Sequence, residues 1–407
     1  MHIVFVSREL GIYKRTGGIG TYVWDIARKI AHHGHKCTVI SSSYDTSMSG
    51  DENINGVRVI KLPDDQLNYK NKVMYFLKFK NNFLAYRKRI NDCLEKLLQE
   101  DKIDIIEYAE YGVESIIWHR RAPRPVPMVI RWHTPIGKQF KLKHILYYPL
   151  KKWIDSLVKE ALNRTDAISF PSQWMADKVS EKIDISRFHY KIIPNGINFS
   201  EWQVENKTIR GKDTKKNINL LFVGTLEARK GFVDLIKAVK ILRRKGFSIM
   251  LTLVGKHSRY SKWILKRESK SIKAGWLKVV GPVQREALPH YYSAADISCF
   301  PSWFETIGLV CLEAMASGSI VIGSSNSGMA EVIRDGIDGF LVEPKKPEIL
   351  AECIKKVIEL PLERKRVIKE EAKKRILENY DNSVIIPRML DFYIKTIARH
   401  KQSVSHS

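Results

Sequence analysis

The sequence predicts an α/β protein made of two doubly wound, Rossmann-like domains with parallel sheets. At roughly 100–200 residues per domain, a chain of 407 residues suits two domains. Hydrophobic residues make up 44% of the chain, enough for each half to bury a core. Short apolar runs alternate with amphipathic helical stretches, which is the pattern of βαβ units. The alternation stops at a polar, aperiodic stretch, residues 201–216, and then starts again.

The first half contains five apolar runs that we expect to form buried strands. A glycine-bearing loop follows the first run, and a helix begins near Thr21. The sequence Pro194-Asn195-Gly196 favours a turn that closes this half. The five expected strands are residues 2–7, 37–42, 103–108, 128–133 and 166–172.

The second half contains six more strand-like runs, and only helical patterns follow them at the end of the chain. We assign an N-terminal domain, a second domain and a C-terminal helix that packs back on the first domain, at residues 1–200, 201–385 and 386–407. Parallel sheets bind ligands at the carboxyl ends of their strands, so the loops there should carry the chemistry. The six expected strands are residues 218–224, 248–255, 277–281, 297–302, 319–324 and 340–344.

The formal charge of +25 predicts attraction to an anionic partner: a lipid surface, a nucleic acid or an acidic polymer. A lysine-rich composition without functional meaning is the alternative. No apolar run reaches the roughly 18 residues of a transmembrane helix, and the N-terminus does not resemble a signal peptide. We therefore expect a cytoplasmic protein. Scattered cysteines fit a reducing compartment better than disulfides or a zinc site; they are Cys37, Cys93, Cys299, Cys311 and Cys353.

Two motifs of the first half lie at the ends of expected strands. Gly17 and Gly18 follow the first strand, where glycines let a backbone approach a ligand and a helix N-terminus offers N–H donors. A tight turn without a ligand is the alternative. The pattern is not GxGxxG and no acidic residue ends the second strand, so a dinucleotide-dependent dehydrogenase is not expected. His133, in RWHTP, ends a later strand and is a candidate site residue, although a lone histidine is more often structural.

Two further motifs lie in the second half. In GTLEARKG, residues 224–231, Arg229 and Lys230 precede a helix and would pair with a diphosphate; a solvated turn is the alternative. Glu305 follows a later strand, and Glu313 lies eight residues further on within an apolar helix. A buried carboxylate needs a hydrogen-bond donor, and ribose hydroxyls are suitable donors. A lysine partner for Glu313 is the alternative.

These motifs resemble, in content and order, the retaining glycosyltransferases of family 4, which have the GT-B fold. The most specific stretch is PSWFETIGLVCLEAMASG, followed by SIVIGSSNSGMAEVI and DGIDGFLVEP, and the segments GTLEARKG, PNGI, RWHTP and GGIG also match. The resemblance spans essentially the whole chain and is weakest over residues 45–125. It implies two Rossmann-like domains facing each other across a cleft, and transfer of a sugar from a nucleotide-sugar donor.

The resemblance also implies roles for individual residues. Glu313 would bind the donor ribose, and Glu305 would hold hydroxyls of the transferred sugar. Lys230, aided by Arg229, would neutralise the leaving diphosphate, and His133 would contact the sugar near the reacting centre. The other donor-binding positions would be Gly17 and Gly18 at the border of the cleft, Gly224 in GTLEARKG, Val283 near the base, and the backbone of Thr306, Ile307, Gly308 and Leu309 around the phosphates.

Some positions depart from the family pattern. Thr225 stands where many members have arginine, Thr306-Ile307 replaces Gly-Phe, and Asn198 replaces an aspartate. Donor identity therefore does not transfer, and we choose UDP over GDP and ADP only because it is the commonest carrier. The family's chemistry uses fixed cations and the chain has no Asp-x-Asp motif, so we expect no metal and no cofactor.

Residues 70–89 contain seven Lys or Arg, five aromatic residues and no acid, and residues 138–152 have a similar character. Such segments suit amphipathic helices on the anionic inner face of a membrane. We therefore expect a glycan or lipid-linked acceptor and peripheral membrane contact. A helix with one buried face and one solvated cationic face is the alternative.

Two other classes of function stay open. A nucleotide-sugar hydrolase, an epimerase or a glycan phosphorylase of the same fold would use similar motifs. A nucleic-acid-binding protein would explain the charge, but the chain lacks a recognised nucleic-acid module and this class leaves Glu305, Glu313 and His133 unexplained. We expect no nucleic-acid partner.

Overall fold

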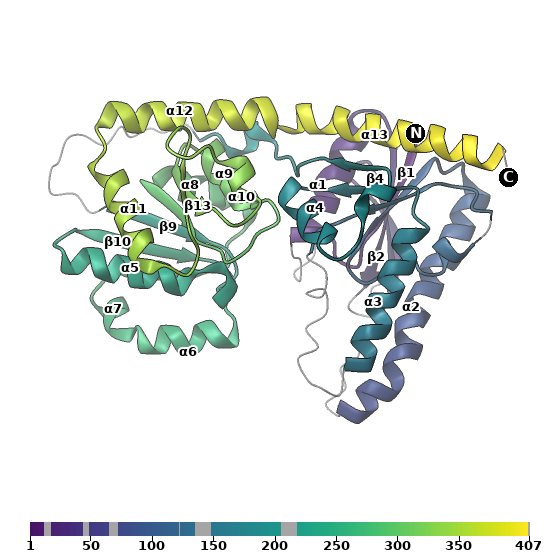
Figure 1. The fold of residues 1–407 in the computed structure, drawn as a ribbon, viewed down its shortest axis with the longest axis horizontal. Helices are drawn as coiled ribbons and strands as arrows, with labels where there is room; N and C mark the ends of the chain where they lie inside the picture. Colours follow the sequence, from purple (N-terminus) through teal and green to yellow (C-terminus); the bar gives the residue numbers. More distant parts are fainter. Residues whose placement is uncertain are drawn as a thin grey trace. The chain divides into compact units, whose positions relative to one another are not determined.

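The computed structural model describes residues 1–11, 18–43, 49–64, 72–121, 123–134, 148–204 and 218–405, with the side chains of 72–82, 148–149 and 151 left out. The chain divides into two compact units, each with its own sheet (Figure 1). Unit 1 comprises residues 1–194 and 386–407, and unit 2 comprises residues 195–385.

The sheet of unit 1 has eight strands in the order β3-β4-β2-β1-β5-β6-β7-β8. All neighbours run parallel except β3 and β4. The strands are β1 His2–Val6, β2 Lys36–Ser43, β3 Gly50–Ile54, β4 Val57–Pro63, β5 Ile105–Ala109, β6 Met128–Arg131, β7 Ala167–Phe170 and β8 Tyr190–Ile192. The helices are α1 Gly18–His32, α2 Lys72–Glu100, α3 Tyr148–Asn163, α4 Gln173–Ser180 and α13 Asn382–Ser405.

The five expected strands of this half are confirmed, but β3, β4 and β8 were not predicted. The hairpin β3–β4 adds one antiparallel pair at the edge of the expected parallel sheet. Asn55 and Gly56 join the two strands with φ values of 52° and 80°. An Asn-Gly pair with positive φ at both residues suits a tight hairpin turn, and this pair was the available signal.

The sheet of unit 2 is parallel throughout, with the strand order β11-β10-β9-β12-β13-β14. All six expected strands are present: β9 Ile218–Val223, β10 Ile249–Val254, β11 Leu277–Gly281, β12 Ile297–Phe300, β13 Ile320–Ser324 and β14 Phe340–Val342. The helices are α5 Phe232–Arg244, α6 Arg259–Arg267, α7 Ser269–Lys273, α8 Leu288–Ala294, α9 Leu309–Ala316, α10 Met329–Val332, α11 Pro347–Glu359 and α12 Leu362–Asn379.

The strand orders fix where ligands should bind. In unit 2 the chain builds outward from β9 to β11, and then from β12 to β14 on the other side. In unit 1 it does the same from β1 and from β5. Open parallel sheets bind ligands at the carboxyl ends of the two strands where this direction reverses. The loops after β9 and β12, and those after β1 and β5, therefore form the candidate site regions.

Segments expected to link the two halves are partly built into the units. Trp202, within the expected linker 201–216, is fully buried in the core of unit 2 because its large ring packs beside Tyr292. Ile197, in the segment expected to turn, instead forms a bridge with Asp381. Residues 205–217 lie outside the described residues.

Of the basic segment 70–89, residues 72–89 lie in α2 and residues 70–71 lie outside the described residues, as does most of the segment 138–152. Arg87, counted among the cations of a membrane-facing surface, is fully buried. Its guanidinium donates to the carbonyl oxygens of Phe83 and Gly112 and lies 3.6 Å from the Glu114 carboxylate. Phe83 is buried too, so at these positions the helix faces the core, as the alternative interpretation had it. No described helix is long and apolar enough to cross a bilayer.

Candidate active site

The loops after β9 and β12 meet at the switch point of unit 2. The amide of Trp303 donates to the carbonyl oxygen of Arg229 at 2.7 Å. Gly231 has a φ of 74°, and a Cβ there would lie 2.0 Å from the carbonyl oxygen of Pro301. Only glycine permits this approach, because any side chain would collide with the neighbouring backbone. Two motifs that are 75 residues apart in the chain thus form one edge of the sheet.

Lys230 and Glu305 form an ion pair across this edge, between the Lys230 Nζ and the Glu305 Oε2. Both side chains are mostly buried, with 19% and 17% of their surface exposed. In this position the lysine can form an ion pair with a phosphate, and the carboxylate can accept a hydrogen bond from a sugar hydroxyl. In the structure the two charges pair with each other, which the sequence did not predict.

Arg229 points to a different partner. Its Nε lies 2.9 Å from the Glu227 carboxylate, and its guanidinium lies 5.5 Å from the centre of the Phe304 ring. Each cation has a carboxylate partner, but 38% of the Arg229 side chain is exposed against 19% for Lys230, so solvent screens the charge of Lys230 less. Gly224, with a φ of 148°, ends β9 just before this segment.

The N-terminus of α9 faces the same edge. Gly308 is its first flanking residue and has a φ of 80°, and a Cβ there would lie 2.9 Å from the Cγ of Met329. The first N–H groups of a helix lack partners within the helix and favour an anion. Ile307 is buried in the core and Leu309 is half-buried. Thr306 is half-buried.

Glu313 is buried on α9, where the Tyr292 hydroxyl donates to its Oε2 at 2.9 Å. This tyrosine lies on α8 and is one partner of the Glu313 carboxylate. Burial and the nearby carboxylate raise the pKa of Tyr292 well above its usual range, so it remains a donor. The sequence did not predict the role of Tyr292, because the order of α8 and α9 along the chain does not show that the two helices pack together. Val283, after β11, is half-buried against the same core.

In unit 1, His133 is buried and lies two residues after the end of β6. Its ring lies 5.0 Å from the ring of Tyr22 on α1. Burial, together with the charge of Arg131, lowers the pKa of His133 well below its usual range, so the imidazole is neutral near pH 7. Within the described part of the chain, its Nε2 has no hydrogen-bond partner. A neutral imidazole with a spare nitrogen suits a hydrogen bond to a ligand better than proton donation as a cation.

Glu110 was not predicted and holds the His133 segment in place. It follows β5, and its Oε2 accepts the His133 amide at 2.7 Å. Burial raises the pKa of Glu110 to about 8, so the carboxyl is mostly protonated at neutral pH. Its position at the carboxyl end of β5, beside the switch point, was the available signal.

A second buried carboxyl in unit 1 lies beneath His133. Glu107 on β5 accepts hydrogen bonds from the hydroxyls of Tyr22 at 3.1 Å and Tyr393 at 2.7 Å. The guanidinium of Arg131 lies 4.7 Å from the centre of the Tyr22 ring. Burial raises the pKa of Glu107. This network ties α1, β5 and α13 together and fixes the ring against which His133 packs.

Gly18 is the first residue of α1 and is exposed, with no atom within 4 Å of the position a Cβ would take. Among the described residues, nothing therefore fills the space in front of it. Gly17 lies outside the described residues.

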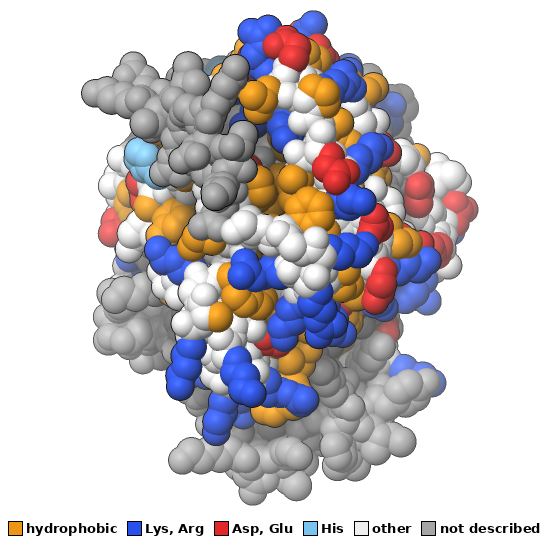
Figure 2. Space-filling view, turned by 90° about the vertical axis from the view of Figure 1, so that its left-hand side faces the viewer, with side chains coloured by type: hydrophobic (Ala, Val, Ile, Leu, Met, Phe, Trp, Pro, Cys, Tyr) orange, Lys and Arg blue, Asp and Glu red, His pale blue; other side chains and the backbone are white. Residues whose placement is uncertain are grey.

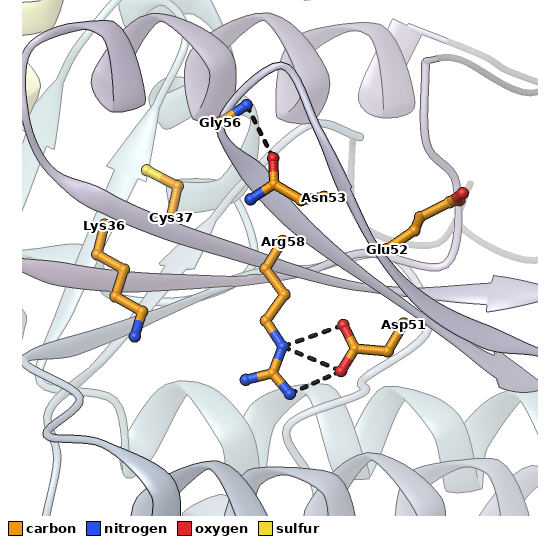
Figure 3. Close-up of a pocket in the computed structure, with 7 residues that line it drawn as sticks. All are labelled: Lys36, Cys37, Asp51, Glu52, Asn53, Gly56 and Arg58. Carbon is orange, nitrogen blue, oxygen red and sulfur yellow. Dashed lines mark hydrogen bonds and ion pairs between the residues drawn. The ribbon is translucent and has the colours of Figure 1, made fainter.

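A cavity of about 310 Å³ lies away from these loops, at the amino ends of β2 and β4 (Figure 3). Its charges are already paired, because Arg58 contacts Asp51 at 2.6 Å and Glu100 at 2.7 Å. Burial raises the pKa of Cys37 to about 12, so its thiol is unreactive at neutral pH. This cavity lies at the opposite ends of the strands from the candidate site. Across the described ranges, no group of three or more His, Cys, Asp or Glu could hold a metal ion.

Comparison with known proteins agrees with this geometry. Residues 203–375 match the group 1 glycosyl transferases, and residues 16–201 match glycosyltransferase family 4. An uncharacterised glycosyltransferase of Methanocaldococcus jannaschii is 27% identical, covering 93% of this chain and 94% of the relative. A glycogen synthase of Mycobacterium tuberculosis is 24% identical, with coverage of 93% and 91%.

Solved structures share the fold over the whole chain. Sucrose-phosphate synthase of Thermosynechococcus elongatus superposes with a TM-score of 0.78 at 20% identity, covering 98% of this chain and 99% of that one. HepE of Anabaena in complex with UDP gives a TM-score of 0.67 at 16% identity and covers both chains fully. The expected GT-B fold is therefore confirmed. With both halves matched, the chain belongs to the family 4 type of glycosyltransferases.

Proposed function

We propose that this glycosyltransferase takes its sugar from a nucleoside diphosphate, with UDP as the first choice, and transfers it with retention at the anomeric carbon. The observation that carries the proposal is the Lys230–Glu305 pair beside the N-terminus of α9. It combines a cation, a carboxylate and the first amide groups of a helix at one sheet edge. These are the groups that a sugar diphosphate needs.

In this proposal the donor diphosphate lies at the N-terminus of α9, against the backbone of residues 306–309. Lys230 exchanges its bond with Glu305 for one to the phosphate, and Arg229 adds a weaker charge. Glu305 is then available to hydroxyls of the transferred sugar. The ribose hydroxyls reach Glu313, which Tyr292 holds from the other side.

In the proposed reaction, the main task of the protein is to stabilise the negative charge that develops on the diphosphate. The bond between the anomeric carbon and the diphosphate oxygen breaks, and its electron pair stays on the diphosphate. The acceptor hydroxyl attacks from the same face and gives its proton to the departing phosphate oxygen. Lys230 and the helix N-terminus stabilise the developing negative charge by preorganised electrostatics, so we propose that transfer needs no metal. The contact of His133 with the sugar, which the family resemblance implies, belongs to the same proposal.

We propose a glycan or lipid-linked acceptor in the assembly of surface polysaccharide. The names of two partial relatives support this choice. One is an O-antigen chain mannosyltransferase of Escherichia coli, 30% identical over 141 residues, and the other is an uncharacterised protein in the cps region of Klebsiella pneumoniae, 28% identical over 182 residues. Peripheral contact with the inner face of a membrane through residues 70–89 and 138–152 belongs to this proposal, without the contribution of Arg87.

Thermal unfolding in the presence of UDP, GDP and ADP tests the donor class. At about 100 times its dissociation constant, a bound nucleotide adds roughly 2.7 kcal/mol to the free energy of unfolding, which raises Tm measurably. We expect a rise with one diphosphate that is the same in magnesium and in EDTA. Glu313→Ala should abolish that rise. No response to any of the three diphosphates would contradict the proposal, and a rise that requires magnesium would contradict its metal-independent part.

A further inference from the structure

The helices α6 and α7 of unit 2 present a strongly basic surface with exposed aromatic side chains. Residues 259–273 contain six Lys or Arg and one acid, Glu268. All six cations are exposed: Arg259, Lys262, Lys266, Arg267, Lys270 and Lys273. Glu268 is paired with Lys240 of α5 at 2.6 Å, so it does not offset this charge. In the described part of the chain none of the six forms an ion pair.

Large apolar side chains lie within this basic surface. Trp263 is 53% exposed and Tyr260 is 40% exposed, with their ring centres 6.3 Å apart. In a helix, residues four apart share a face, so Trp263 lies between Arg259 and Arg267. The Arg267 guanidinium lies 4.7 Å from the centre of the Trp263 ring. On α7, Ile272 is 38% exposed beside two lysines.

The figures agree with this description. In Figure 1, α6 and α7 form the outer margin of unit 2, beyond α5. Figure 2 looks at that side, and in its lower part, at the height of these helices, Lys and Arg side chains gather around hydrophobic ones. We call the exposed side chains of residues 259–273 the α6–α7 surface.

We propose that the α6–α7 surface binds the headgroup region of an anionic lipid membrane. Lys and Arg are attracted to anionic lipid, and Trp and Tyr favour the interface, where an apolar ring meets a polar layer. A single strand of nucleic acid fits less well, because Arg267 already covers one face of Trp263 and because Ile272 cannot stack on a base. This proposal rests on the surface alone and is independent of the proposed donor chemistry.

The α6–α7 surface is also joined to the loop that carries Lys230. Ser258, which caps α6, donates from its hydroxyl to the Leu226 carbonyl at 2.7 Å. The amide of Leu226 in turn donates to the Lys256 carbonyl at 2.9 Å. A membrane bound to α6 would therefore hold the catalytic loop of unit 2 close to the lipid. This arrangement would favour acceptors that reside in the membrane.

Flotation with vesicles tests the proposal on the full chain. The probes are vesicles of phosphatidylcholine alone and vesicles that contain about one-third phosphatidylserine. We expect binding to the anionic vesicles only, and loss of most of that binding at 0.5 M salt, where the Debye length falls to about 4 Å.

The decisive comparison is between two triple variants with the same change of charge. K262Q/K266Q/K270Q removes three cations of the α6–α7 surface, and K374Q/K395Q/K401Q removes three exposed lysines of α12 and α13. Each lysine near an anionic surface contributes about fivefold to binding, so the first variant should bind on the order of 100-fold more weakly. The second should bind nearly as the parent does. Trp263→Ala should weaken binding several-fold at both salt concentrations, because it removes apolar contact.

Equal loss in both triple variants would overturn the proposal, since binding would then depend on total charge. It would also be overturned if the parent chain ignored anionic vesicles but bound single-stranded oligonucleotides through the same three lysines. The rise in Tm with nucleotide, measured on each variant, shows whether the donor site is intact. A variant that loses vesicles but keeps nucleotide binding separates this surface from the proposed transferase site.

Discussion

At the scale of single residues, the ion pair between Lys230 and Glu305 joins the two loops of the candidate donor site. Both side chains are mostly buried. Within the described residues, the side chain of each has the other as its only hydrogen-bond partner. A ligand that binds the Lys230 ammonium in place of Glu305 must also offer the Glu305 carboxylate a hydrogen-bond donor. A sugar diphosphate can do both, because its phosphate meets the lysine and its sugar hydroxyls can donate to the carboxylate.

Lys230→Ala should lower kcat by about 10²–10³-fold, because a fixed charge that stabilises the leaving group is lost. The KM for the acceptor should change little. Initial rates with the nucleotide-sugar identified by the thermal experiment provide the measurement. Arg229→Ala is the matched control and should lose less, since 38% of the Arg229 side chain is exposed against 19% for Lys230 and solvent screens its charge more. An unchanged kcat for the Lys230 variant would remove this residue from the mechanism.

Glu110 predicts a pH dependence of stability. Its pKa rises from 4.5 to about 8 on burial, so the folded chain holds a proton between these values that the unfolded chain releases. The contribution of this carboxyl to stability is therefore full below about pH 4.5 and is lost as the pH rises through 8. Glu110→Gln keeps an acceptor for the His133 amide and cannot ionise, so its stability relative to the parent should increase from pH 5 to 8.5.

Denaturant unfolding of both chains across this pH range measures the difference. Because Glu107 and Glu114 are also buried with raised pKa values, only the difference between parent and variant reports on Glu110. The exposed Glu378→Gln is a control that should leave the curve unchanged. Parallel curves for the parent and Glu110→Gln would show that the carboxyl does not titrate as described.

At the scale of secondary-structure elements, the strands that the sequence predicted are those with continuous apolar runs. In β1, β5, β6 and β7 every residue is buried, because parallel strands in the middle of a doubly covered sheet face the core on both sides. The strand β3 has mostly exposed residues, and β8 has exposed ones too, so neither carries that pattern. Edge strands gain their order from pairing rather than from burial.

The hairpin β3–β4 depends on its turn. Gly56 has a φ of 80°, and no atom lies within 4 Å of the position of a Cβ there. Gly56→Ala should therefore cost about 1–2 kcal/mol of unfolding free energy, from backbone strain rather than from a collision. Denaturant unfolding provides the measurement. Gly18→Ala, also in open space but without a positive φ, is the control and should leave stability unchanged or slightly raised. Equal effects of the two changes would contradict this account of the turn.

At the scale of the whole molecule, the last helix links the end of the sequence to the beginning. Residues 386–407 are part of unit 1, although the preceding 191 residues form unit 2. Tyr393 bonds Glu107, and His400 lies 2.7 Å from Asp166. The returning helix thus supports the network beneath His133. The net charge of +25 belongs to this scale as well, and the α6–α7 surface is one place where it gathers.

The sequence by itself determined the fold class, most of the strands and the segments that carry the site. It could do so because burial imposes a local periodicity and because glycines and charges at strand ends are visible in the chain. The resemblance to family 4 added the expected roles, and the match of both halves confirmed the family.

Only the tertiary structure decided which groups meet. Three contacts depend on strand order and helix packing. They are the ion pair of Lys230 with Glu305, the hydrogen bond from Tyr292 to Glu313 and the hydrogen bond from the His133 amide to Glu110. Arg87 also shows that a local pattern does not fix the environment of one residue, since this cation of a basic segment is fully buried. A local pattern reflects the average environment of a residue, whereas a partner 21 or 286 positions away is selected only when the sheet and its helices assemble.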